Sequence, residues 1–192
     1  MTDATSGSPV VSKPPPAKRK RTAVSPKVEP EADTYVVDDK FIDIPETMES
    51  IIDICRGAAW NVLKELVSGY STSVWKQAMG VELRLVCTPD LRVARDVQVE
   101  VLYRQMCLDS ISVDFVISHD GRPVMYLFIQ RKASKLTAND MVVMFNVQEQ
   151  IFKQTSFRPW CMVLHFLPSS LRTAVMYDGR VLDETEKALE QD

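Results

Sequence analysis

Hydrophobic residues recur every three or four positions between residues 45 and 68, and again between residues 71 and 85. This spacing places apolar side chains on one side of a helix, so both segments are predicted to be amphipathic helices. Pro45 suits a helix start and Gly69 a helix end. The predicted buried stripe of the second helix consists of Val74, Ala78, Val81 and Leu85.

The apolar pattern then changes to the period of a β-strand. Residues 95–104 alternate strictly between apolar and polar, which predicts a strand with one solvated face. Two apolar runs follow on either side of Asp120-Gly121, a dipeptide typical of a tight turn, so residues 111–132 are predicted to form a β-hairpin. The remaining predicted elements are a helix from Thr137 to Phe152, a buried strand at 160–167, a short edge strand at 173–177 and a helical or frayed segment at 183–190.

This order of elements predicts an α/β domain. Three strands joined by short turns form an antiparallel meander, and the helix after the hairpin then crosses to a further strand, which can be parallel. The expected organisation is a disordered tail at residues 1–40, which has almost no large apolar residues before Tyr35, a folded domain at 41–182 and a C-terminal tail at 183–192.

Three polar residues stand out in the hairpin. Asp114 interrupts the first apolar run, and Gln130 and Lys132 end the second. Strand side chains alternate between faces, so Gln130 and Lys132 point the same way, and pairing around Asp120-Gly121 brings them toward Asp114. A carboxylate, an amide oxygen and an ammonium on one face could hold a divalent cation and a phosphate. The competing interpretation is a cross-strand ion pair between Asp114 and Lys132, with Gln130 merely ending the strand.

Several segments share the order of motifs in a known nuclease superfamily. They are Gly69-Tyr-Ser-Thr72-Ser-Val-Trp75, Arg95-Asp-Val-Gln-Val-Glu-Val-Leu-Tyr103, Val113-Asp114-Phe-Val-Ile117, Ile129-Gln130-Arg-Lys132-Ala133, and Gln148 followed four residues later by Phe152. Over roughly residues 45–170 the chain resembles the PD-(D/E)XK nuclease superfamily, and locally its GxxExxY branch. The resemblance implies a restriction-endonuclease-like core, here with an extra N-terminal helix.

The resemblance also implies a role for each matched residue. Asp114 and Gln130 would bind Mg²⁺, Lys132 would act with them in catalysis, and Gln148 would support the site. Three positions depart from the family pattern, because Thr72 replaces a Glu, Trp75 replaces a Tyr and Gln130 replaces the Glu of Glu-x-Lys. Asp114 is then the only anionic member of the matched set.

Two functions follow from these residues, and a third from the tail. The first is a divalent-metal-dependent nuclease that cleaves phosphodiester bonds through Asp114, Gln130 and Lys132. The second, which the three departures favour, is a nuclease-derived module with weakened or lost catalysis that associates with nucleic acid or a protein partner. The third is a regulator whose useful part is the basic N-terminal tail.

That tail carries most of the remaining signals. Residues 1–27 hold six basic residues and one acidic residue, whereas residues 40–182 hold 16 basic and 15 acidic residues. A near-neutral net charge does not indicate a broad nucleic-acid-binding surface on the domain. The consecutive basic residues Lys18, Arg19, Lys20 and Arg21 resemble a nuclear import signal, which predicts an import receptor as partner; the alternative is a basic arm that adheres to nucleic acid.

Other sequence features narrow the class of protein. Ser25 and Lys27 lie in segments that resemble a phosphorylation site and a SUMO-acceptor site. The four cysteines are expected to be buried thiols of an intracellular protein, and neither they nor the two histidines have the spacing of a zinc site. No apolar run is long enough to span a membrane, and the polar N-terminus does not read as a secretory signal.

Overall fold

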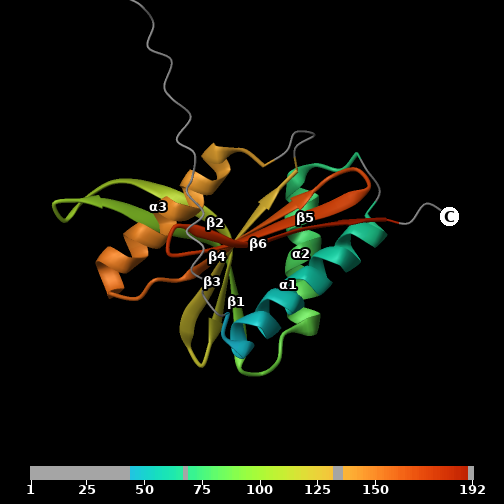
Figure 1. Cartoon of the computed structure of the whole chain (residues 1–192), viewed down its shortest axis with the longest axis horizontal. Coiled ribbons are helices and arrows are strands. Elements are labelled where there is room, and N and C mark those ends of the chain that lie inside the picture. The colour runs from blue at the N-terminus through green and yellow to red at the C-terminus, as the bar shows by residue number, and fades with distance from the viewer. Residues whose placement is uncertain (1–43, 67–68, 132–135, 190–192) are drawn as a thin grey trace, which may run out of the picture. The chain divides into compact units, whose positions relative to one another are not determined.

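The computed structural model describes residues 44–66, 69–131 and 136–189. These residues form a six-stranded sheet with helices packed on it (Figure 1). The elements, in chain order, are α1 (Glu46–Glu65), α2 (Thr72–Val86), β1 (Leu91–Tyr103), β2 (Met106–His119), β3 (Arg122–Gln130), α3 (Ala138–Thr155), β4 (Trp160–Phe166), β5 (Ser170–Tyr177) and β6 (Arg180–Ala188).

The strands lie in the sheet in the same order as in the sequence. Neighbouring strands are antiparallel except β3 and β4, which are parallel and are joined by the crossover helix α3. The predicted meander, crossover helix and further parallel strand are therefore confirmed. The mixed α/β arrangement agrees with a restriction-endonuclease-like core.

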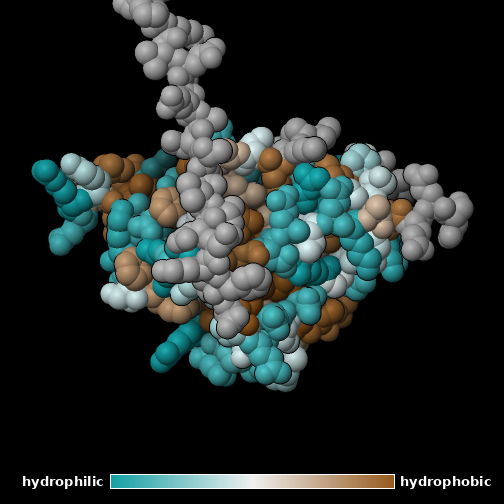
Figure 2. All heavy atoms as spheres, in the orientation of Figure 1, coloured by the Kyte–Doolittle hydropathy of each residue, from teal (hydrophilic) through white to brown (hydrophobic). Residues whose placement is uncertain are grey.

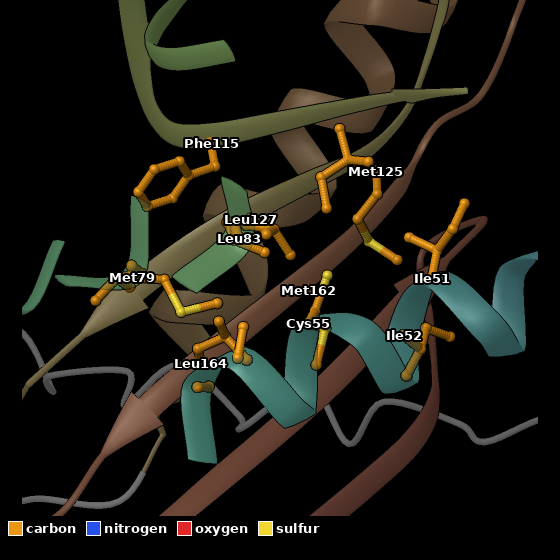
Figure 3. Close-up of a cluster of buried hydrophobic side chains, with 14 of the residues drawn as sticks. Ile51, Ile52, Cys55, Met79, Leu83, Phe115, Met125, Leu127, Met162 and Leu164 are labelled. Carbon is orange, nitrogen blue, oxygen red and sulfur yellow. The ribbon is translucent and has the colours of Figure 1, made fainter. Parts of the chain in front are cut away.

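Buried side chains form two clusters. One cluster joins α1 and α2 to side chains of the sheet, including Phe115 and Leu127, and Figure 3 shows its members from these helices and from β2, β3 and β4. The other contains Met144 and Val147 of α3 together with Tyr126 and Phe128 of β3. Because strand side chains alternate between faces, the neighbouring residues 126, 127 and 128 contribute to different clusters. The sheet is therefore the middle layer, with α1 and α2 on one face and α3 on the other.

Helix α1 follows its predicted pattern closely. Most of its apolar positions from Met48 to Leu63 are buried, and Cys55, Ala58 and Ala59 are fully buried. Figure 2 shows mainly hydrophilic residues over the outer side of this helix. Small side chains at 58 and 59 permit close approach of neighbouring elements. The burial of one stripe therefore fixes which side of α1 faces the sheet.

The predicted buried stripe of α2 is wrong by one position. Trp75, Met79 and Leu83 are buried, whereas Val81 and Leu85 have exposed fractions of 49% and 73%. Both sets have helical spacing, so periodicity alone does not choose between them. The sheet buries the set that contains the larger side chains, and Trp75 packs against Phe166 with ring centroids 4.9 Å apart.

The C-terminal segment is also different from the prediction. Residues 183–190 were expected to be helical or frayed, but most of them belong to β6, which pairs with β5 along its whole length. As a result, β5 is longer than predicted and is an interior strand. The helix interpretation failed because β6 is rich in charged residues, which suit a sheet edge exposed to water. Asp178 and Gly179 form the turn before β6, with both residues at positive φ.

Side-chain contacts connect α1 to the last two strands of the sheet. Arg56 of α1 forms an ion pair with Asp183 and donates a hydrogen bond of 3.1 Å to the hydroxyl of Thr173.

None of the helices in the described part of the chain is both long and apolar enough to cross a membrane.

Candidate functional site

The predicted hairpin is formed by β2 and β3. Asp120 and Gly121 have φ values of 50° and 76°, the backbone that a two-residue type I′ turn requires. His119 and Arg122 face each other on either side of this turn. The turn chemistry read from the sequence therefore sets the register that positions Asp114 on β2 and Gln130 on β3.

Asp114 lies just beyond the last residue pair between β2 and β3, Phe115 with Leu127. Its Oδ2 accepts a hydrogen bond of 2.6 Å from the main-chain N–H of Ile129. The carboxylate thus satisfies a donor that the end of the β2–β3 pairing leaves open. Asp114 has an exposed fraction of 8%, so its negative charge needs compensation by the protein.

Lys76 provides that compensation. Its ammonium, from α2, forms an ion pair with Oδ1 of Asp114. The lysine side chain is 34% exposed and that of Asp114 only 9%, so the pair lies at the boundary between the core and solvent. The ion pair weighed from the sequence joined Asp114 to Lys132, which lies outside the described residues. Sequence reasoning missed Lys76, although a carboxylate flanked by apolar residues on a strand already signalled a need for a cation.

Gln130 is held by another acidic residue that sequence reasoning missed. Its Nε2 donates a hydrogen bond of 2.8 Å to Oδ1 of Asp140. The other oxygen of Asp140 accepts hydrogen bonds from the main-chain N–H and the hydroxyl of Thr137, each 2.8 Å, and forms a capping box at the start of α3. The available signal was Thr137 with an acidic residue three positions later. The amide of Gln130 thereby ties the end of β3 to the N-terminus of α3.

The remaining atom of this amide is the Oε1 of Gln130. It is buried and has no hydrogen-bond partner among the described residues. An amide oxygen can bind a cation but adds no negative charge. Gln130 therefore offers at most a neutral ligand to the site.

Gln148 lies elsewhere on α3. Its Nε2 donates hydrogen bonds of 2.9 Å to the carbonyl oxygens of Pro159 and Met176, and its Oε1 accepts one of 3.2 Å from the N–H of Gly179. Gln148 is fully buried, and it lies eight residues along the helix from Asp140, about 12 Å. The structure does not bring it to Gln130, and its contacts connect α3 to the start of β4 and to the β5–β6 turn.

Two arginines pack on the rings of residues that adjoin the ion pair in sequence. Arg131 donates to the carbonyl oxygen of Tyr70, and its guanidinium lies 5.0 Å from the ring centroid of Trp75, the residue before Lys76. Arg95 lies 5.6 Å from the ring centroid of Phe115, the residue after Asp114. Each guanidinium packs on an aromatic ring that belongs to the core.

The two signature positions on α2 have different surroundings. Trp75 is 2% exposed, and its indole N–H has no hydrogen-bond partner among the described residues. Thr72 is the first residue of α2, and Ser71 precedes it as the N-cap. Neither side chain adds an anionic ligand.

The donor set does not fit a magnesium ion. Mg²⁺ prefers oxygen ligands with negative charge and is usually held by one or two carboxylates. The carboxylate of Asp114 is already paired with Lys76, and Asp140 accepts three hydrogen bonds from Gln130 and Thr137. Among the described residues, no group of three His, Cys, Asp or Glu side chains could hold a metal ion. What the arrangement offers is one acid whose charge is balanced by a lysine.

Comparison with known proteins gives one match. A family model described as the PD-(D/E)XK nuclease superfamily matches residues 49–145, slightly more than half of the chain. The matched segment runs from α1 into α3 and includes Asp114, Gln130 and Lys132, whereas Gln148 and β4 to β6 follow it. No curated protein and no solved structure matches the chain.

Proposed function

The chain belongs to the PD-(D/E)XK nuclease superfamily, and from this membership we propose that it is a nuclease-derived module with weakened or lost catalysis. It associates with nucleic acid in the nucleus. Within the superfamily we assign it to the GxxExxY branch, on the segment from Gly69 to Trp75 and the strand from Arg95 to Tyr103. The assignment accepts Thr72 and Trp75 as replacements for the Glu and Tyr of that signature.

The observation that carries the loss of catalysis is the ion pair between Lys76 and Asp114. Metal-assisted hydrolysis of a phosphodiester needs a cation that polarises the phosphate and activates water. Asp114 is the only acid in the matched set, and its charge is balanced by the lysine. Gln130 contributes no charge, and its amide nitrogen is committed to Asp140.

Association with nucleic acid is supported by cationic side chains on the same elements as this pair. Arg95 packs on the ring of Phe115 and Arg131 on the ring of Trp75, which are the sequence neighbours of Asp114 and Lys76. Phosphate contacts of this kind supply sequence-independent affinity for a polynucleotide. The domain as a whole is near neutral, so the six basic residues of residues 1–27 provide additional charge.

The alternative is an active nuclease that uses Mg²⁺ with Asp114, Gln130 and Lys132. PD-(D/E)XK nucleases generally use divalent metals, which favours this alternative. It requires Lys76 to leave Asp114 before a metal binds. Lys76 is one-third exposed, so such a movement would not need to disrupt the core.

Cleavage assays distinguish the two functions. The full-length chain is incubated with single- and double-stranded DNA and RNA in Mg²⁺ or Mn²⁺, beside Asp114→Asn, Lys132→Ala and the control Lys153→Ala on the exposed side of α3. We expect binding that weakens with salt and no cleavage above the Asp114→Asn background. Metal-dependent cleavage that both Asp114→Asn and Lys132→Ala abolish, but Lys153→Ala does not, would establish the alternative. Absence of binding to any polynucleotide would redirect the proposal to a protein partner.

The nuclear location rests on the tail. Lys18, Arg19, Lys20 and Arg21 form the proposed import signal, read by an import receptor, and Ser25 and Lys27 are proposed modification sites; all of these residues lie outside the described part of the chain. A reporter fused to residues 1–30 should accumulate in the nucleus, and replacing the four basic residues by alanine should abolish this. A cytoplasmic reporter would contradict the proposal.

A further inference from the structure

The surroundings of Asp114 disagree with the divalent-cation site of the superfamily, and the disagreement has a specific form. The position next to Oδ1 is taken by the ammonium of Lys76, and Oδ2 is taken by the N–H of Ile129. Both oxygens of the one available carboxylate are therefore engaged by groups of this chain. An ion that binds Oδ1 of Asp114 competes with the ammonium of Lys76 for this oxygen.

The lysine is suited to this position. An ammonium is a compact charge on a flexible stem, and here it reaches from α2 to a carboxylate that is only 9% exposed. Burial of a carboxylate is unfavourable unless a cation or hydrogen-bond donors compensate it. A fixed lysine provides this compensation whether or not metal is present in solution.

We propose that Lys76 replaces the divalent cation in this domain and excludes metal from Asp114. Its ammonium supplies the positive charge that balances the carboxylate of Asp114. The inference rests on the proposed loss of metal-dependent catalysis and names the residue that causes it. It concerns binding of an ion, so it can be tested without any measurement of nuclease activity.

The test uses Mn²⁺ alone as the probe of the full-length protein. Binding is measured by titration calorimetry and by electron paramagnetic resonance of free Mn²⁺. The variants are Lys76→Met, which keeps an unbranched apolar side chain without the charge, and Lys76→Met combined with Asp114→Asn. The wild type should show no Mn²⁺ binding that depends on Asp114. Lys76→Met should bind Mn²⁺ at least about tenfold more tightly than the wild type does, and the double variant should lose this gain.

Two controls separate the effect of position from that of net charge. Lys153→Met removes one positive charge from an exposed position of α3 and should not change Mn²⁺ binding. Lys76→Arg keeps a cation beside Asp114 and should remain without metal. Gain of binding in Lys153→Met equal to that in Lys76→Met would overturn the proposal, because the effect would then be one of overall charge.

The proposal stays testable if Lys76→Met folds poorly. The wild type and Asp114→Asn are then compared alone, and equal, weak Mn²⁺ binding supports the proposal, whereas binding that Asp114→Asn removes overturns it. For folded Lys76→Met, Mn²⁺ should raise the melting temperature by several degrees, because a ligand of the native state stabilises it. Failure of Lys76→Met to gain binding would also overturn the proposal. Mn²⁺ binding by the wild type at Asp114 without cleavage would refute this inference and leave the proposed loss of catalysis intact.

Discussion

The ammonium of Lys76 and the carboxylate of Asp114 form an ion pair that joins α2 to β2 at the edge of the core. The carboxylate lies where the pairing of β2 with β3 ends, and its second oxygen accepts the N–H of Ile129. One acidic residue thereby connects a helix and two strands. The same contacts that hold these elements together occupy the only acid among the residues that the family resemblance assigns to the catalytic site.

The energy of this pair can be measured with a double-mutant cycle of Lys76→Met and Asp114→Asn. Exposed ion pairs contribute about 0–1 kcal/mol, and loss of one partner of a buried pair costs about 3–5 kcal/mol. Because Asp114 is buried and Lys76 is one-third exposed, we expect a coupling energy of about 1–2 kcal/mol in urea unfolding. The pair of Arg172 and Glu186, whose carboxylate side chain is 43% exposed, is the comparison and should give a smaller coupling energy. A coupling energy near zero for Lys76 and Asp114 would contradict their pairing in solution.

Gln148→Leu should destabilise the domain strongly. The change removes three hydrogen bonds, two to the buried carbonyl oxygens of Pro159 and Met176 and one from the partly buried N–H of Gly179. Loss of such hydrogen bonds costs about 1–3 kcal/mol for each unsatisfied group, so for three groups we expect a decrease of at least about 3 kcal/mol in the free energy of unfolding. Gln154→Leu, also on α3, removes one exposed hydrogen bond and should cost less than about 1 kcal/mol. Equal effects would show that Gln148 does not hold α3 to the sheet.

Truncation tests the role of β6. Removal of residues 183–192 deletes most of this strand together with Asp183, the partner of Arg56. It would expose the edge of β5, whose side chains are largely buried. We therefore expect that the shortened protein no longer unfolds cooperatively and that it aggregates during gel filtration. Removal of residues 190–192 alone keeps every described contact of β6 and should leave the melting temperature unchanged. A stable, monomeric product ending at residue 182 would contradict the strand assignment.

The four cysteines should differ in reactivity. All were expected to be buried, but Cys107 is exposed and Cys87 is only partly buried, whereas Cys55 and Cys161 are fully buried. Burial raises the pKa of the Cys55, Cys87 and Cys161 thiols, so they stay protonated in the native state and react slowly. At pH 8 a thiol reagent should modify Cys107 fastest and Cys87 more slowly, and should reach the other two only after unfolding. Equal rates for all four would contradict this order.

Alkaline pH should weaken the fold for the same reason. The raised thiol pKa values in the native state mean that the unfolded chain releases protons first as the pH rises. The stability that the native state gains from keeping these thiols protonated is fully present below the ordinary thiol pKa of about 8.5, and it is lost progressively as the pH rises above this value. In urea titrations between pH 8 and pH 10, Cys161→Ala should therefore show a shallower decline of stability than the wild type. A parallel decline in both proteins would rule out a contribution from this thiol.

Acid pH tests Asp90. Its pKa is lowered by a hydrogen bond from its own main-chain N–H, then by the hydroxyl of Thr88 and by His119. A lowered carboxyl pKa stabilises the native state at pH values above about 3.9, the carboxyl pKa of the unfolded chain. This stabilisation is lost as the pH falls through the lower pKa of the native state. Asp90→Asn should flatten that part of the pH dependence in thermal unfolding. An unchanged acid limb would show that these hydrogen bonds do not persist in solution.

The local elements were largely predictable, because their signals lie in neighbouring residues. The Asp120-Gly121 turn follows from the conformational freedom of these residues, and the start of α3 follows from Thr137 and its capping box with Asp140. Prediction failed where two local patterns were equally good or where a partner was needed. On α2 two apolar stripes share the helical period, and β6 has the composition of a charged helix until β5 pairs with it.

The candidate site divides in the same way. By itself, the sequence determined that Asp114 and Gln130 lie on the two strands of one hairpin, because the turn and the alternation of strand side chains are local properties. Only the tertiary structure decided their partners, Lys76 for Asp114 and Asp140 for Gln130. These contacts depend on how α2 and α3 pack on the sheet, and a buried carboxylate accepts whichever cation that packing brings within reach. Local sequence patterns therefore determine the type of nuclease scaffold, whereas packing between distant segments determines the chemistry of its site.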